Sequence, residues 1–261
     1  MVLGVESVTL EFEGLRVLAD VSFGVDEGTL TALVGPNGAG KTSLLNCVSG
    51  FYVPTRGGIT FRQRRISGEP PHRVAAYGVA RVFQFIELFR HMSVLDNILL
   101  GRHRHMRAGV LAGSLFWGRS RREETGERRR VEEVIELLEL ERYRKEPIAN
   151  LPFGVQKLVG VGRALAMEPA LLLLDEPSTG MNREEKENLA RFLLRIKHEL
   201  GTTMLWIEHD IELVGDLAEH VVVLDFGQKI AEGRAESVLR DQKVAEAYLG
   251  RSYDTRKGSR R

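Results

Sequence analysis

A glycine-rich segment near the N-terminus is the first whose residue types and spacing could do chemistry. Its glycines would let backbone N–H groups wrap phosphate oxygens, as in a phosphate loop. Its lysine is expected to reach the β- and γ-phosphates, and its threonine to hold Mg²⁺. It therefore predicts a site for ATP and Mg²⁺. In chain order the residues are Gly35, Pro36, Asn37, Gly38, Ala39, Gly40, Lys41, Thr42 and Ser43.

Two carboxylates further along the chain could complete such a site. Asp175 and Glu176 follow the apolar run Leu171 to Leu174, which does not alternate with polar residues. An unbroken apolar run is typical of a parallel strand covered on both faces. Ligands of open α/β sheets collect at the carboxyl ends of such strands. We therefore expect both carboxylates to face the nucleotide.

A third segment could bind an anion through its backbone. A short loop at Pro152 to Gly154 precedes a helix expected over residues 155–167. Unpaired N–H groups and the helix dipole favour negative charge at such a helix start.

The elements around these residues follow from hydrophobic patterning. Leu30 to Val34 is predicted to be a strand that leads into the phosphate loop, and Gly40 to about Ser49 the helix that leaves it. At the N-terminus, apolar residues alternate with polar ones, which predicts antiparallel strands with one buried face. These apolar residues are Val8, Leu10 and Phe12, then Val21, Phe23 and Val25.

The rest of the chain divides into a helical segment and a resumed α/β core. Residues 93–163 have a helical pattern, inserted between core residues 1–92 and 164–233. Strands alternating with helices imply parallel pairing. A closing helix is expected over 234–249, which ends a single domain at 250, and a disordered tail over 251–261. The expected core elements are strands 79–83, 171–175, 202–207 and 220–225 with helices 183–200 and 210–217.

Composition narrows the class of protein. The 261 residues carry a net charge of only +1, which argues against a nucleic-acid binder. No apolar run is long enough to cross a bilayer, and the N-terminus lacks an export pattern, so we expect a soluble cytoplasmic chain. Cys47, the only cysteine, is expected in the core.

Arginines are concentrated between Arg102 and Arg130, where nine stand against three glutamates. A solvated, partly helical face would explain this charge, and so would contact with anionic lipid headgroups beside a membrane partner. An apolar island in the same stretch suits either a small local core or a subunit-facing hairpin. The island consists of Val110, Leu111, Leu115, Phe116 and Trp117.

Together these motifs resemble the nucleotide-binding subunit of ABC transporters, over about Val5 to Gly250. The segment LPFGVQ stands where that family usually has LSGGQQ. The family's other motifs follow in order, with Gln84 as the Q-loop, residues 179–182 as the D-loop and His209 as the switch histidine. The resemblance implies a P-loop ATPase core with an antiparallel β subdomain and an inserted α-helical subdomain.

The resemblance also implies roles for individual residues. Asp175 would hold Mg²⁺ together with Thr42 and Gln84, and Glu176 would be the general base. His209 would contact the γ-phosphate and keep the water in line. Phe12 matches the aromatic residue that stacks on adenine, although its place in an alternating strand leaves core burial open. Gly154 would contact the ATP of a partner chain.

Departures from the family pattern indicate which branch of the family the chain resembles. Pro152 replaces a serine hydroxyl and can donate no hydrogen bond, while Phe153 and Val155 replace a glycine and a glutamine. Aromatic-containing signatures without serine occur in ATPases of the branched-chain amino acid type. The segment VAEAYLG at Val244 to Gly250, the phrase IEHDIELV and the arginine-rich insertion are similar to the same branch.

The resemblance therefore implies an ATPase subunit that energises uptake of branched-chain or other amino acids. Its expected partners are a second ABC ATPase subunit, identical or homologous, transmembrane permeases and, indirectly, a solute-binding protein. It would lie on the inner face of the cell membrane. Urea, short amides or exported lipopolysaccharide remain alternative cargoes, and a non-transport ABC ATPase is the alternative from another class.

Overall fold

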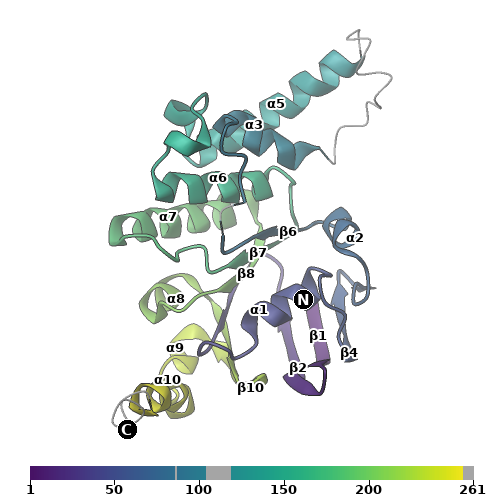
Figure 1. The fold of residues 1–261 in the computed structure, drawn as a ribbon, viewed down its shortest axis with the longest axis vertical. Helices are drawn as coiled ribbons and strands as arrows, with labels where there is room; N and C mark the ends of the chain where they lie inside the picture. The colour runs from purple at the N-terminus through teal and green to yellow at the C-terminus, as the bar shows by residue number, and fades with distance from the viewer. Residues whose placement is uncertain (86, 104–118, 255–261) are drawn as a thin grey trace.

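Six strands form the sheet that carries the phosphate loop (Figure 1). A computed structural model describes residues 1–85, 87–103 and 119–254, without the side chains of 119–125 and 249–254. All neighbouring strands of this sheet run parallel, except that its edge strand β10 is antiparallel to β9. The order is β10 (Gln228–Arg234), β9 (His220–Asp225), β3 (Leu30–Val34), β8 (Thr203–Ile207), β7 (Leu171–Asp175) and β6 (Val79–Val82).

A second, antiparallel sheet contains the N-terminus. Long strands β1 and β2 pair with each other, and β1 also pairs with β4. Val8, Leu10 and Val21 of β1 and β2 are buried, as their alternation predicts. The order is β2 (Leu15–Val25), β1 (Leu3–Phe12), β4 (Arg56–Phe61) and β5 (Arg64–Arg65).

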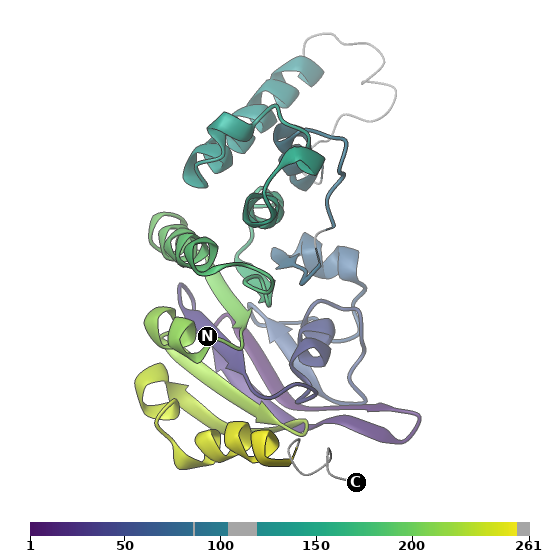
Figure 2. The ribbon, with the colours of Figure 1, turned by 60° about the vertical axis from the view of Figure 1, so that its left-hand side comes forward.

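Side chains of the parallel strands alternate between two hydrophobic cores. Leu171 and Leu173 of β7 pack with helix α1 (Lys41–Val48) and the antiparallel sheet. Leu172 and Leu174 face the opposite core, which contains helices α7 (Arg183–Leu200) and α8 (Ile211–Leu217). The layers are visible in Figure 2. The β7 run is apolar throughout because both of its faces are covered.

Cys47 lies in the core beside the antiparallel sheet, as expected. It is 1% exposed, and burial raises the pKa of its thiol to about 12. The thiol is therefore protonated and unreactive at neutral pH.

Helices α3 (Val94–Leu99), α5 (Arg119–Leu137) and α6 (Phe153–Leu165) form the inserted helical segment. The helices pack closely at Gly162 of α6. A Cβ at this position would lie only 3.0 Å from Leu138 and 3.1 Å from Ile98. Helix α2 (Pro71–Ala76) precedes β6. Short helix α9 (Ala235–Val238) and helix α10 (Gln242–Asp254) follow β10. Three 3₁₀ turns lie at Leu100–Arg102, Glu141–Tyr143 and Ile148–Asn150.

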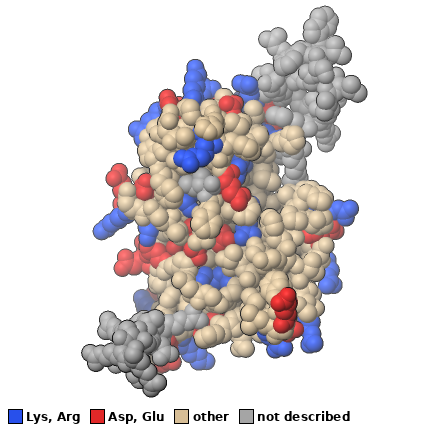
Figure 3. Space-filling model, in the orientation of Figure 1, with Lys and Arg blue, Asp and Glu red and all other residues tan. Residues whose placement is uncertain are grey.

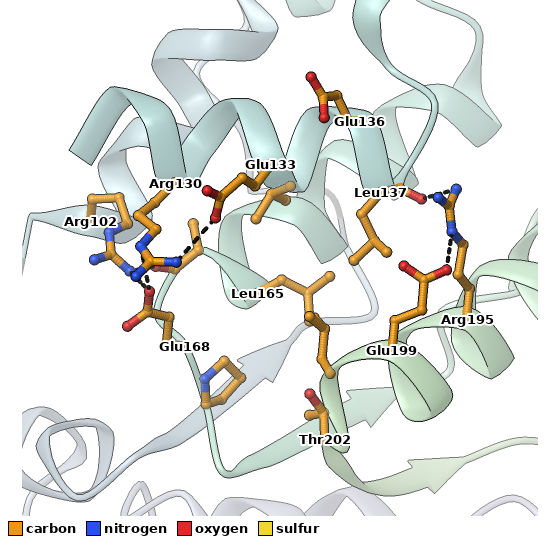
Figure 4. Close-up of a pocket in the computed structure, with 14 residues that line it drawn as sticks. Arg102, Arg130, Glu133, Glu136, Leu137, Leu165, Glu168, Arg195, Glu199 and Thr202 are labelled. Carbon is orange, nitrogen blue, oxygen red and sulfur yellow. Dashed lines mark hydrogen bonds and ion pairs between the residues drawn. The ribbon is translucent and has the colours of Figure 1, made fainter. Parts of the chain in front are cut away.

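A cavity of about 490 Å³ lies where the helical segment meets the core (Figure 4). Arg102 is buried at its edge, where it donates to Glu127 of α5 and to the carbonyl of Ala166 and pairs with Glu168. At the other end Arg195 of α7 donates to the carbonyl of Leu137. These contacts attach α5 to the core on the side of the cavity shown.

The structure corrects several expected boundaries. The helix expected over 155–167 begins at Phe153 and ends at Leu165. Strand β10 was not predicted from the sequence. A single closing helix over 234–249 is wrong, since α9 and α10 are separate. The disordered tail is wrong for 251–254, which lie in α10, while 255–261 lie outside the described residues.

Much of the arginine-rich stretch, with its whole apolar island, also lies outside the described residues. On the face drawn in Figure 3, acidic and basic side chains are interspersed. Within the described part of the chain, no helix has the length and hydropathy to span a membrane.

Candidate active site

The phosphate loop connects β3 to α1 and depends on glycine at two positions. Gly35 has φ +147°, and a Cβ there would lie 2.0 Å from the carbonyl oxygen of Leu224. Gly40 has φ +96°, and a Cβ there would lie 2.8 Å from Leu18. Only glycine fits both the positive φ and the close packing. The loop is therefore held against β9 and β2 with its amides at the N-terminus of α1.

A cavity of about 230 Å³ opens above this loop. The Lys41 ammonium bends back into the loop, donating to the carbonyl oxygens of Gly35 at 2.7 Å and Pro36 at 3.0 Å. An anion in the cavity would meet the N-terminus of α1 and the lysine together. The lining residues are Val17, Asn37, Gly38, Ala39, Gly40, Lys41, Thr42, Ser43 and Glu176.

Asp175 ends β7 beside α1 and is held on both carboxylate oxygens. Thr42 Oγ1 donates to Oδ1 at 3.4 Å, and the Arg81 guanidinium donates to Oδ2 at 2.7 Å. Both partners of the ion pair are buried, at 7% and 4% side-chain exposure. A buried carboxylate requires such compensation, since desolvation of an unpaired charge costs several kcal/mol or more.

Arg81 is itself fixed by two polar groups at the C-terminal end of α1 and by the aromatic ring that follows β6. It donates to Asn46 Oδ1 at 2.7 Å and to Ser49 Oγ at 3.0 Å, and its guanidinium carbon lies 4.7 Å from the centre of the Phe83 ring. These contacts leave the guanidinium little freedom to turn away from Asp175.

Glu176 accepts hydrogen bonds from two of the sequence-predicted residues. Gln84 donates to Oε2 at 2.7 Å, and His209 Nε2 lies 2.5 Å from Oε1. Thr179 donates to Oε2 at 3.3 Å. Glu176 has φ +48°, a conformation rare outside glycine, so the backbone is strained where it turns this carboxylate toward the cavity.

Glu208 is a functional candidate that sequence reasoning missed. It is 2% exposed, accepts from Ser178 at 2.6 Å and accepts from the backbone N–H of His209 at 2.8 Å. Asp210 then caps α8 by accepting from the Leu213 N–H at 3.3 Å. Glu208 thus ties the loop after Glu176 to the loop that carries His209.

Phe12 lies at the end of β1 with 42% of its surface exposed. Its ring meets Tyr52 edge to face, with centroids 5.1 Å apart. Core burial, one of the two alternatives left open, is therefore wrong, and an exposed aromatic surface remains for a planar ligand.

The segment Leu151 to Val155 does not line the phosphate cavity. Pro152 takes the N-cap position of α6 without a side-chain hydrogen bond, and Phe153 is 43% exposed. The Gly154 N–H donates to Glu185 Oε1 of α7 at 3.0 Å.

Lys157, one turn into α6, links this helix to the predicted Q-loop. Its ammonium donates to the Gln84 carbonyl oxygen at 2.5 Å and lies 5.6 Å from the centre of the Phe153 ring. Burial lowers the pKa of Lys157, while the charge of Glu176 acts in the opposite direction.

The structure thus brings Thr42, Asp175, Glu176, Gln84 and His209 to one edge of the parallel sheet, and leaves Gly154 apart. The contributions of Arg81, Glu208 and Glu185 depend on contacts between separate elements. The only sequence signal for any of them is the place of Glu208 within the motif that contains His209.

Comparison with known families places the chain among its relatives. The family described as ABC transporter matches residues 18–179, and the family described as branched-chain amino acid ATP-binding cassette transporter matches residues 228–254. The high-affinity branched-chain amino acid transport ATP-binding protein LivG of Salmonella typhimurium is 35% identical over 248 residues, which cover 95% of this chain and 97% of LivG. BraF of Pseudomonas aeruginosa is also 35% identical, covering 95% of this chain and 98% of BraF.

Solved structures show the same fold. A nucleotide-free ATP-binding cassette from an ABC transporter superposes with a TM-score of 0.81 at 31% identity, covering 95% of this chain and 98% of the other. The ADP conformation of an ABC transporter cassette gives a TM-score of 0.83 at 32% identity, with the same coverage. The chain belongs to the ABC transporter family, as an ATP-binding protein of the branched-chain amino acid type.

Proposed function

We propose that this chain is the ATP-hydrolysing subunit of an importer that energises uptake of branched-chain or other amino acids through membrane permeases. The observation that carries the proposal is the Glu176 carboxylate, which is contacted by Gln84 and His209 at the mouth of the phosphate cavity. A carboxylate held beside a phosphate site is placed to accept a proton from water.

ATP binds with its phosphates over the N-terminus of α1. Loop residues between Asn37 and Ser43 donate backbone N–H groups, and Lys41 exchanges its two loop carbonyls for phosphate oxygens. The exposed ring of Phe12 stacks on the adenine, next to Tyr52.

The residues present fit a Mg²⁺ ion shared with the nucleotide. Thr42 Oγ1 and Asp175 Oδ1 are adjacent oxygen donors, and Gln84 lies close by on Glu176. Among the described residues there is no cluster of three or more His, Cys, Asp or Glu that could hold a metal alone. Mg²⁺ prefers few protein oxygens together with substrate phosphates, and when bound it neutralises charge on the β- and γ-phosphates.

Hydrolysis begins when Glu176 takes a proton from a water aligned with the γ-phosphate. The water oxygen bonds to phosphorus as the bond to the ADP oxygen breaks, and ADP and phosphate leave. His209 keeps Glu176 and the water in line and hydrogen-bonds the γ-phosphate. Gln84 contacts Glu176 through its side chain and Lys157 of α6 through its backbone carbonyl. It therefore transmits changes at the nucleotide site to the helical segment.

Two such subunits close head to tail, so that the Gly154 region of each meets the ATP bound by the other. The second subunit is this chain or a homologue of it. Closure and reopening move the helical segment, which passes the motion to the permeases on the inner face of the membrane. A solute-binding protein delivers the cargo on the other side. Within this scheme each chain supplies one half of each ATP site.

The test is ATPase activity of the assembled transporter, reconstituted with its permeases and solute-binding protein. A panel of branched-chain and other amino acids, urea, short amides and lipopolysaccharide would be added in turn. Stimulation by branched-chain amino acids is expected. Stimulation by lipopolysaccharide alone, or by urea alone, would overturn the amino-acid assignment while leaving the ATPase assignment intact.

A further inference from the structure

The Glu185 side chain joins two segments that are distant in the sequence. Glu185 lies in the first turn of α7, where its backbone N–H donates to Asn182 Oδ1 at 2.9 Å and its Oε2 accepts from the Asn182 N–H at 2.9 Å. This reciprocal pair is a capping box. The other carboxylate oxygen, Oε1, is not used by the capping box and can accept a hydrogen bond from outside α7.

Oε1 of Glu185 accepts a hydrogen bond from Gly154, the second residue of α6, at 3.0 Å. The carboxylate is packed closely on this glycine, because a Cβ on Gly154 would lie 2.5 Å from Oε1 and 2.7 Å from the carboxyl carbon. An acidic group of the same chain therefore occupies an amide at the N-terminus of α6.

The donors at this end of α6 are mainly backbone N–H groups. Pro152 has no N–H group, and its side chain makes no cap. The N–H of Gln156 is already bonded to the Pro152 carbonyl at 3.0 Å. An anion approaching α6 therefore depends on the backbone N–H groups of its first turn, among which the Gly154 N–H is taken by Glu185.

We propose that Glu185 holds the Gly154 N–H in the free chain and is displaced from it when the ATP of a partner subunit arrives. Glu185 thereby raises the ATP concentration that is needed to close the dimer. The inference rests on the proposed function, in which the Gly154 region meets the partner's ATP. A carboxylate and a phosphate are both negative, so they repel each other and compete for the same N–H.

The neighbouring Glu184 provides a matched control. It lies in the same first turn of α7 and makes the same favourable interaction with the helix dipole. It is exposed, and no hydrogen bond joins it to Gly154. Replacing either glutamate with glutamine removes one negative charge from the same turn, but only Glu185→Gln changes the group that faces Gly154.

The experiment measures dimer mass by light scattering across an ATP titration, in a Glu176→Gln background that slows hydrolysis. Glu185→Gln should lower the ATP concentration for half-maximal dimer by about tenfold, because the neutral amide no longer repels phosphate. Its single carbonyl oxygen can accept from Asn182 or from Gly154 but not from both, and glutamine keeps the capping box when it accepts from Asn182. Glu184→Gln should leave it unchanged. Glu185→Asp, which keeps the charge, should stay close to the parent.

Two results would overturn the inference, and they are distinguishable. Equal ATP dependence in Glu185→Gln and Glu184→Gln would overturn the role of Glu185 alone. Absence of an ATP-dependent dimer in every variant would overturn the proposed dimer as well. Denaturation midpoints check that the capping box survives. If Glu185→Gln is unfolded, the Glu185→Asp result decides, since tightening by a variant that keeps the charge would contradict competition between charges.

Discussion

The two segments that would meet at a shared ATP differ in how they are built. The phosphate-loop side holds its charged groups by specific side-chain contacts, with Asp175 between Thr42 and Arg81, and Glu176 among three donors. The α6 side offers backbone amides after a proline, with one amide already occupied by Glu185. Under the proposed function, this difference makes the hydrolytic half of the chain complete and predicts that the half offered to a partner is weakened.

If the partner is a homologue with a different signature, the two ATP sites of the dimer are unequal. The site that contains Glu176 of this chain is then completed by the partner's signature. The other site receives Pro152 and Gly154 of this chain. Substitutions at Glu176 should therefore change ATP turnover, whereas substitutions at the start of α6 should change ATP-driven dimer formation.

The largest expected effect is on hydrolysis. Glu176→Gln removes the proton acceptor and should lower ATP turnover by about 10²- to 10⁴-fold, with ATP binding retained. Glu187→Gln, which breaks only an exposed ion pair with Arg183, is the control and should leave turnover unchanged. A Glu176→Gln chain that hydrolyses ATP within a few-fold of the parent would remove Glu176 from the catalytic role.

The buried ion pair of the hydrolytic half should dominate its stability. Arg81→Met leaves the Asp175 carboxylate buried without its partner and should lower the free energy of unfolding by about 3–5 kcal/mol. Denaturant unfolding of Arg183→Met supplies the control, because the Arg183 side chain is 93% exposed and its loss should cost less than about 1 kcal/mol. Similar losses in the two variants would show that the Arg81 contact contributes little.

A substitution at the start of α6 should strengthen ATP-driven dimer formation. Pro152→Ser returns a hydroxyl at the start of α6 and should tighten ATP-driven dimer formation by about tenfold or more, since a hydrogen bond to a charged group contributes roughly 1.5–3 kcal/mol. Light scattering in the Glu176→Gln background measures this. Serine also suits an N-cap, so the fold should tolerate the change. No gain in dimer formation would show that Pro152 is not what limits this half.

The smallest effect concerns the pair that joins α7 to α8. Lys186 donates to Asp210 at 2.8 Å, an interaction that lowers the pKa of Asp210 and raises that of Lys186. The lowered pKa means that Asp210 contributes stability above its ordinary value of 3.8, and that this is lost as pH falls through the folded value. The raised pKa means that the Lys186 contribution is lost only at alkaline pH, above its ordinary 10.5.

Lys186→Met should therefore cost up to about 1 kcal/mol at pH 7, because the pair is partly exposed. The difference from the parent chain should shrink as the solution is acidified below pH 4. Denaturant unfolding at several pH values would check this. A difference that persists unchanged at pH 3 would show that Lys186 stabilises the fold by packing and not by charge.

The elements of the core could be predicted because their patterns are unambiguous. β3 and β7 are short apolar runs at the ends of recognisable motifs, and α7 has a capping residue and a closing glycine. β10 was missed because its sequence, QKIAEGR, lacks a clear apolar alternation, and its pairing with β9 defines it instead. Helices α9 and α10 were merged because no proline or glycine marks the break between them.

The candidate site could be predicted where a motif places a residue at the end of a strand. Asp175 ends β7, Glu176 follows it, and His209 lies two residues after β8, so their meeting at one edge follows from parallel pairing. Arg81 could not be assigned this way, because it lies in the middle of β6 and reaches Asp175 only through the β6–β7 register, which pairs it with Leu173. The Glu185 contact with Gly154 depends on how α6 and α7 pack, which no local pattern encodes.

The most direct test of a complete hydrolytic half and a partner-facing half is the mass of the Glu176→Gln chain, measured by light scattering with and without ATP and Mg²⁺. The chain should be monomeric without ATP and dimeric with it, retaining bound ATP in the dimer. The shared ATP site would be contradicted if the chain stayed monomeric at every ATP concentration, both alone and when mixed with a homologous ATPase subunit.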